Sequence, residues 1–187
     1  MRRTFKACCY VVAGCILSTL AIAQAPISAS PMPPQAVGPS GPAGEMQRSY
    51  EAVKKNILKS ADNMPAENFS FKPEPDIRTF ARIVNHVSEA QLHSCGAVNG
   101  TKDLAKVPAE TADKASIVEA LKASFAECDK AYGATTDATL ADPIAMGQAK
   151  RSRIGVLWGN ISHDNEQYAA LALYMRLKGI APPSSEK

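Results

Sequence analysis

The chain has 187 residues, of which 45% are hydrophobic and 21% charged, and its formal net charge is +3. Arg2, Arg3 and Lys6 account for that excess, because the rest of the chain carries 18 basic and 18 acidic side chains. A chain that is neutral beyond its N-terminus gives no reason to expect binding to nucleic acid or to an anionic membrane.

The N-terminus has the features of an export signal. The three bases precede an almost unbroken run of apolar or small residues, 7–23, and Ala21-Ile22-Ala23 has the small-x-small pattern of a cleavage site. We therefore predict a cleaved signal peptide over residues 1–25 and an exported protein, periplasmic or secreted, that leaves the membrane after cleavage. Two alternatives stay open. One is a retained membrane anchor, for which the run is short, and the other is a lipoprotein attached at Cys15.

Residues 26–44 are rich in Pro, Ala, Ser and Gly and contain no acid and no base. Such a segment cannot bury enough apolar surface to offset the loss of chain entropy on folding, so we predict a disordered linker. Residues 45–187 are then long enough for one ordinary domain.

Four segments of that domain have apolar residues at helical spacing. They cover about 45–62, 77–98, 112–132 and 149–178. Turn or breaker residues follow each segment, such as Asn99-Gly100 after the second and Gly179 after the fourth. Residues 133–146 are polar and turn-rich, and no region is rich in predicted strands. The sequence therefore predicts an all-α domain, an antiparallel-type four-helix bundle.

Two cysteines, Cys95 and Cys128, remain beyond the predicted signal peptide. In an oxidising compartment an even pair of cysteines is compatible with a disulfide bond. Two buried thiols that pack as small apolar residues are the alternative.

Histidines on two of the predicted helices are the candidate functional residues. His86 lies at the edge of the apolar stripe of the second segment. His163 lies on the fourth, and Gln167 follows it by one turn, so these two side chains share a face. An imidazole from each helix and an amide oxygen form a three-ligand set for a metal ion. Histidines that are hydrogen-bonded within the core are the alternative.

Several motifs support a resemblance over residues 45–185. They are Phe71-Lys72-Pro73, residues 83–90 around His86, residues 163–168, and the C-terminal run 174–185. With these motifs the chain resembles the DinB-like (damage-inducible) four-helix superfamily, which is grouped with the YfiT-type thiol-dependent transferases and the mycothiol-dependent isomerases. The resemblance implies a metal site with one histidine from the second helix and two, four residues apart, from the last.

The implied ligands fall on His86, His163 and Gln167, and the third departs from the family pattern. A glutamine offers a neutral carbonyl oxygen, which is a poorer ligand than imidazole for zinc or nickel. We therefore expect a degenerate site with lower metal affinity.

Three further side chains lie near the candidate ligands in the sequence. Glu89 and Glu166 each follow a histidine by three residues and are interpreted either as partners of these rings or a base, or as solvated carboxylates. His93 lies about 10 Å along the helix from His86. It is therefore expected at the surface, with replacement of the missing ligand as the alternative.

Two functional hypotheses follow. The first is a metal-dependent enzyme that holds a divalent zinc, nickel or manganese ion and acts on a small molecule or a thiol. Its substrate class, a small electrophile or a thiol conjugate, is implied by the resemblance alone. The second is a non-catalytic binding or structural protein with a vestigial metal site. The sequence does not decide whether the protein is an enzyme, and pairing into a homodimer is compatible with either hypothesis.

Overall fold

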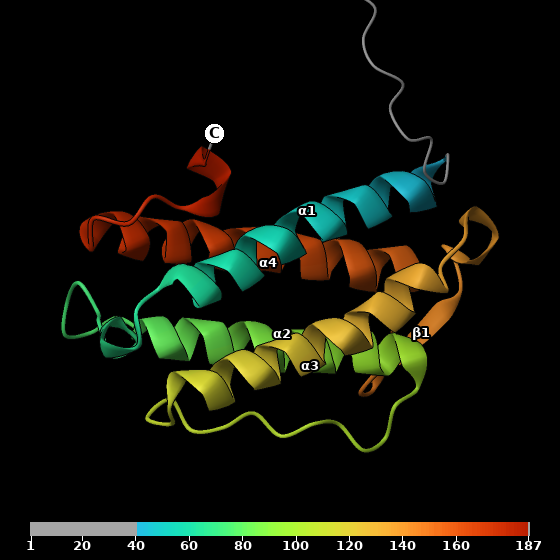
Figure 1. Ribbon diagram of the computed structural model, residues 1–187. Coiled ribbons are helices and arrows are strands. Elements are labelled where there is room, and N and C mark those ends of the chain that lie inside the picture. Colours follow the sequence, from blue (N-terminus) through green and yellow to red (C-terminus); the bar gives the residue numbers. More distant parts are fainter. Residues whose placement is uncertain (1–40, 187) are drawn as a thin grey trace, which may run out of the picture. The chain divides into compact units, whose positions relative to one another are not determined.

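The computed structural model describes residues 41–186, which belong to one compact unit of the chain. The predicted signal peptide, 1–25, and residues 26–40 of the predicted linker lie outside the described residues. The described part is built on four long α-helices, which confirms the predicted all-α bundle (Figure 1). They are α1 (Pro42–Asn63), α2 (Phe80–Asn99), α3 (Lys114–Gly133) and α4 (Arg153–Leu177), joined or followed by the short 3-10 helices η1 (Ala66–Asn68), η2 (Asp137–Thr139) and η3 (Pro183–Ser185).

Local capping interactions explain where three of the helices begin. Thr79, Asp113 and Ser152 each precede a helix, and each side-chain oxygen accepts a hydrogen bond from the backbone N–H three residues later, at 3.0, 2.9 and 3.2 Å. Gly100 ends α2 with a φ of 70°, a left-handed conformation that glycine adopts without strain. α1 begins at Pro42, three residues before the predicted start, because proline is well suited to the first helical turn.

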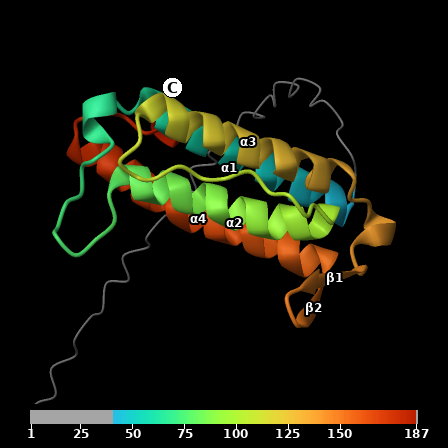
Figure 2. The ribbon, with the colours of Figure 1, turned by 90° about the horizontal axis from the view of Figure 1, so that it is seen from below.

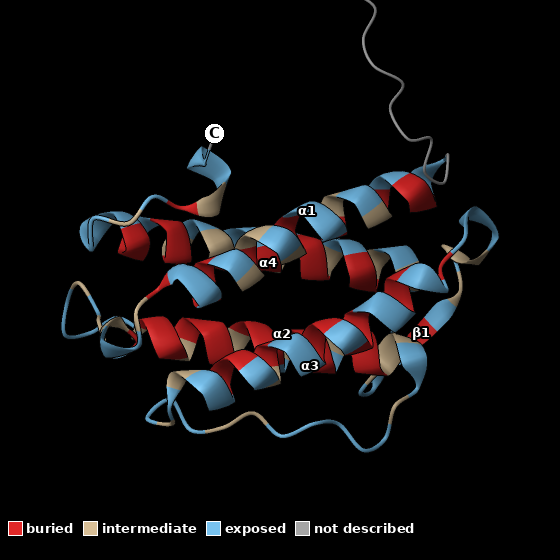
Figure 3. Cartoon of the chain, viewed as in Figure 1, coloured by how far each residue is buried: buried red, intermediate tan, exposed pale blue. Residues whose placement is uncertain are grey.

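The helices are arranged so that α2 packs between α3 and α4, while α1 packs against α4 and α3. Figures 1 and 2 show α1 beside α4 and α2 beside α3. Figure 3 shows that buried residues line the faces that the helices turn toward one another. The neighbouring positions of α2 and α4 are what the candidate site depends on, since each of these helices carries one of the two histidines.

Aromatic stacking fills the middle of the core. The rings of Tyr50 and Tyr132 stack with centroids 3.9 Å apart and planes inclined by 9°. The Tyr50 hydroxyl donates to Asp129 Oδ1 at 2.6 Å, so its polar end is satisfied. Burial raises the pKa of the Tyr50 phenol well above its ordinary value, and the hydroxyl therefore stays a donor. Other large side chains with almost no exposure are Phe80, Phe125, Ile57, Leu121, Leu157 and Met175.

A short β-hairpin between α3 and α4 corrects the sequence analysis. Strand β1 (Pro143–Met146) pairs antiparallel with β2 (Ala149–Ser152), and Gly147 turns the chain with a φ of 63°. Residues 149–152 were predicted as the start of the last helix, and residues 143–146 as part of a polar, turn-rich connection. The prediction was wrong because Ile144 is the one buried residue of the eight, so the strands have no apolar alternation to detect.

A disulfide bond joins Cys95 on α2 to Cys128 on α3, with their Cα atoms 5.0 Å apart. Of the two alternatives for this cysteine pair, the structure has the bridge. It closes a loop over a sequence separation of 33 residues. In the chain-entropy model such a loop stabilises the folded state by about 3–4 kcal/mol.

No helix among residues 41–186 combines the length and the apolar character that crossing a lipid bilayer requires.

Glu127 on α3 ties the C-terminal end of α2 to the bundle. Its Oε1 accepts hydrogen bonds from the Thr101 hydroxyl and from Asn99 Nδ2, the latter at 2.8 Å. Lys130 Nζ lies 3.2 Å from Oε2. These donors, with the Thr101 hydroxyl making the largest contribution, lower the pKa of Glu127 below its ordinary value.

Glu127→Gln is expected to lower the free energy of unfolding by about 1 kcal/mol at pH 7, because the hydrogen bonds lose their charge assistance. A carboxylate with a lowered folded-state pKa stabilises the protein above its ordinary pKa of 4.5 and loses this contribution as the pH falls through the folded-state value. The wild type and the variant should therefore converge below pH 4.5 in urea unfolding experiments. Glu119→Gln, at an exposed position on the same helix, is the matched control. A difference that stays constant down to acidic pH would contradict this account.

Candidate functional site

The structure brings together the two histidines that the sequence singled out. His86 on α2 and His163 on α4 are 77 residues apart in the chain, yet their Nε2 atoms lie 3.2 Å from each other. The ring centroids are 4.9 Å apart and the rings meet nearly edge to face. Both side chains are about one quarter exposed, so the pair lies at the edge of the core and within reach of solvent.

The Nε2 separation is compatible with two kinds of contact. Two neutral imidazoles can share one hydrogen bond, in which one ring donates and the other accepts. Two ligands of a single tetrahedral ion, each at 2.0–2.1 Å, would have their nitrogens about 3.3 Å apart. The 3.2 Å distance in this structure is therefore close to the separation expected for two ligands of one ion.

Carboxylates lie on the opposite side of both rings. Nδ1 of His86 is 3.7 Å from Glu89 Oε2, and Nδ1 of His163 is 3.5 Å from Asp164 Oδ1. Arg82 holds Glu89 through two parallel hydrogen bonds of 2.9 and 3.0 Å. Both distances from Nδ1 are longer than a hydrogen bond, so the carboxylates lie near the Nδ1 atoms without accepting from them in this structure. A carboxylate that approached Nδ1 more closely would accept its proton and favour the tautomer in which Nε2 carries the lone pair, as is usual for metal-binding histidines.

Burial keeps His86 in the form that can bind a metal ion. Loss of solvation lowers its pKa below the ordinary value, and the positive charges of Arg78 and Arg82 and the neighbouring His163 lower it further. Glu89 acts in the opposite direction. The ring is therefore neutral near pH 7, with Nε2 free of a second proton.

Asp164 is the functional residue that the sequence analysis missed. Its side chain has no exposed surface, and burial raises the pKa of its carboxyl group. Its Oδ1 and Nδ1 of His163 are both buried atoms without a hydrogen-bond partner, and they face each other at 3.5 Å. A signal was present in the sequence, because an acid three residues after Ile161 and seven before Leu171 falls on the apolar stripe of the helix.

A buried polar network from three helices surrounds this carboxylate. Oδ2 of Asp164 accepts from Gln91 Nε2 at 3.0 Å, and Oε1 of Gln91 accepts from the Ser124 hydroxyl at 2.7 Å. Asn160 donates to the same Oδ2 at 3.5 Å and accepts from the Tyr132 hydroxyl at 2.9 Å. Because buried polar groups are costly when unpaired, the network holds α2, α3 and α4 in one relative position.

Gln167, the third predicted ligand, lies one turn beyond His163 on the buried side of α4 and is 8% exposed. Within residues 41–186 no hydrogen bond joins it to either histidine. The same residues contain no group of three or more His, Cys, Asp or Glu side chains that could hold a metal ion. A third protein ligand of the usual types is therefore not gathered at this site, and Gln167 remains the candidate for that position.

The remaining candidates differ in their surroundings. His93 and Glu166 are exposed, as expected for surface residues. Glu89 is also exposed, but its position beside His86 matches the interpretation as a partner of that ring.

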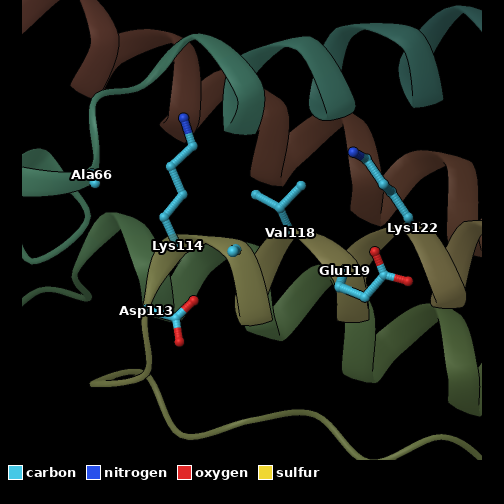
Figure 4. A pocket seen from close by; sticks show the side chains of 7 residues that line it. Ala66, Asp113, Lys114, Val118, Glu119 and Lys122 are labelled. Atoms are coloured by element: carbon cyan, nitrogen blue, oxygen red, sulfur yellow. The ribbon is translucent and has the colours of Figure 1, made fainter.

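A groove elsewhere in the bundle is lined by residues whose contacts serve the fold. It has a volume of about 550 Å³, and Lys114, Val118 and Lys122 of α3 are among its lining residues (Figure 4). Lys114 Nζ donates to the backbone oxygens of Asp62 and Met64, at 2.7 and 2.8 Å, and so satisfies the end of α1. Neither histidine of the pair lines this groove.

Comparison with known proteins identifies the family. Residues 49–170 match the model of the DinB superfamily. The chain belongs to the DinB superfamily. Among curated proteins, none matches the chain.

Solved structures share the fold of this DinB-superfamily chain. A DinB-like protein from Bacillus cereus has 18% identity and a TM-score of 0.63, and the match covers 74% of this chain and 93% of the other. A conserved protein from Enterococcus faecalis has 15% identity and a TM-score of 0.58, with 74% and 98% covered. A DinB-like protein from Bacillus subtilis has 14% identity and a TM-score of 0.55, with 72% and 92% covered. At these identities the likeness concerns the fold.

Replacing the central donor of the polar network is expected to destabilise the protein. Gln91→Leu keeps the volume but leaves Asp164 Oδ2 without its nearest donor, so the free energy of unfolding should fall by about 2–3 kcal/mol. In an Asp164→Asn background the same change should cost less, because the group left unpaired has no charge. Urea unfolding of the two single variants and the double variant measures this coupling. Equal losses in both backgrounds would contradict a direct interaction.

Proposed function

We propose that the protein is a metal-dependent member of the DinB superfamily that binds a divalent zinc, nickel or manganese ion between α2 and α4. His86 and His163 are the two principal ligands, each through Nε2. The observation that carries this proposal is the 3.2 Å separation of the Nε2 atoms, which suits two ligands of one ion.

The surrounding residues prepare the two rings for this role. Glu89 and Asp164 lie 3.7 and 3.5 Å from the Nδ1 atoms, and their negative charge favours the tautomer in which Nε2 carries the lone pair. Arg82 holds Glu89 in place, and Gln91 holds Asp164. The chain therefore presents two imidazoles already close together, and little side-chain entropy is lost when they bind.

The reaction proposed for such a centre is either hydrolysis or a thiol-dependent group transfer. When bound, a divalent ion lowers the pKa of a coordinated water or thiol and so supplies a nucleophile at neutral pH. Gln167 offers its amide oxygen as a third ligand, which is weaker than the imidazole of the family pattern. A small electrophile or a thiol conjugate as substrate follows from the family resemblance.

The alternative function is a non-catalytic binding or structural protein. The glutamine in place of a third histidine favours it, because two imidazoles alone hold a metal ion weakly. In that case the contact between His86 and His163 is a hydrogen bond between the two rings.

Metal content distinguishes the two functions. Purified protein loaded with zinc, nickel or manganese and then desalted should retain about one ion per chain in elemental analysis, as expected for a single site. His86→Ala and His163→Ala should each abolish retention. His93→Ala, which removes the histidine outside the pair, is the matched control and should retain the ion. The metal-dependent function fails if the wild type retains no ion at micromolar concentrations and His86→Ala leaves thermal stability unchanged.

A histidine at position 167, as the family resemblance implies, gives a second test of the same site through its metal affinity. Gln167→His should raise metal affinity by about tenfold or more, equivalent to at least 1.4 kcal/mol, because imidazole replaces a weak oxygen donor. Isothermal titration with the metal ion measures the gain. An unchanged affinity would exclude residue 167 from the coordination sphere.

Export forms part of the proposal. The signal features of residues 1–25 support it, and so does the Cys95–Cys128 bridge, since disulfide bonds are typical of oxidising compartments.

N-terminal sequencing of the protein recovered from the periplasm or medium should give a chain that begins near Pro26. An intact N-terminus in the cytoplasmic fraction would overturn export by cleavage.

A further inference from the structure

A cavity of about 300 Å³ lies directly beside His163 and has no role in the function proposed so far. Its walls come from three parts of the chain. α2 contributes His93 and Ser94, the hairpin contributes Arg151, and α4 contributes Asn160 and His163. Of the histidine pair, His163 lines the cavity and His86 does not, so a ligand in the cavity would reach the pair from the side of His163.

Arg151 occupies a defined position in this cavity. Its Nη2 donates to the backbone oxygen of Gly155 at 2.8 Å. A Cβ atom on Gly159 would lie 3.7 and 3.8 Å from the two terminal nitrogens, which places the guanidinium group over Gly159. His163 follows Gly159 by four residues, about 6 Å along the helix axis. The positive charge of Arg151 thus lies roughly one turn from the histidine pair.

The electrostatics of the cavity favour a negatively charged group. Arg151 carries a permanent positive charge, and Ser94 adds a hydroxyl donor. Among residues 41–186, no Asp or Glu lines the cavity to neutralise this charge. A guanidinium group has five N–H donors, so the single bond to Gly155 leaves donors for a carboxylate, which it can bind in a bidentate manner.

We propose that this cavity binds a carboxylate group of the substrate against Arg151, while the reacting end of the same molecule lies at His86 and His163. The substrate is then a small carboxylate whose reactive group lies about one helical turn, 5–6 Å, from its carboxyl group. The reaction at the histidine pair rests on the proposed function, whereas the carboxylate site rests on Arg151 and the cavity alone.

The first test uses metal-free protein with succinate as the probe. Succinate should give saturable NMR shifts of the His93 and His163 ring signals, whereas succinamide, its uncharged isostere, should give none. Arg151→Gln should weaken succinate binding about tenfold, because a charge-assisted hydrogen bond is lost. Lys150→Gln makes the same charge change one residue earlier on the same strand and should leave the affinity unchanged. Equal affinities for the wild type and Arg151→Gln, or no saturable shift, would overturn the carboxylate site.

The second test uses metal-loaded protein and two hydroxamates, which bind metal ions by the same group. Succinic acid monohydroxamate should bind about tenfold more tightly than butyrohydroxamate, which has a methyl group in place of the carboxylate. Arg151→Gln should remove this preference without changing the metal content or the affinity for butyrohydroxamate. Equal binding of the two probes to the loaded wild type would refute the substrate assignment.

The two tests separate the two proposals. If the protein retains no metal ion but binds succinate through Arg151, the metal-dependent function fails and the carboxylate site stands. If the metal ion is retained but neither succinate nor the acidic hydroxamate is preferred, the carboxylate site fails and the metal-dependent function stands.

Discussion

The carboxylate of Asp164 has no contact with solvent, and the geometry of the site depends on how its hydrogen bonds are satisfied. Gln91 on α2 reaches it directly, and Ser124 and Tyr132 on α3 reach it through Gln91 and Asn160. A buried carboxylate that lost these donors would be costly, so the three helices are held in one register. That register sets the positions of the two imidazoles, whose nitrogens face each other on helices that are far apart in the sequence.

The bundle could be predicted because its signals are local and repeated. Apolar residues at helical spacing and helix breakers such as Gly100 indicate where the helices lie. Because the apolar stripes of these helices pack into one core, histidines beside the stripes can come into contact. The hairpin could not be predicted, because of its eight residues only Ile144 is buried. Asp164 lay within the predicted stripe, but charged residues are expected at the surface, and its role depends on donors from other helices. The position of Arg151 could not be predicted for a similar reason, since its guanidinium group lies over Gly159 and donates to the backbone oxygen of Gly155 on another element.

The candidate site matches two of the three ligand positions that the family resemblance implies. The chain keeps an imidazole on α2 and one on α4, with a carboxylate beside each ring. The third position holds Gln167, so the two rings and their partners carry most of the binding that a metal ion would receive. The Cys95–Cys128 bridge fixes α2 to α3. Rigid support of this kind lowers the entropic cost of holding two ligands in place, which matters most where the ligand set is small.

The hairpin has an evolutionary consequence. It contributes one wall of the cavity through Arg151, yet its residues are mostly exposed and add almost nothing to the core. Insertions, deletions and substitutions in such a segment cost little stability. Substitutions in this segment can therefore change the lining of the cavity while the bundle and its histidines stay unchanged, so the cavity wall and the stability of the fold can evolve separately.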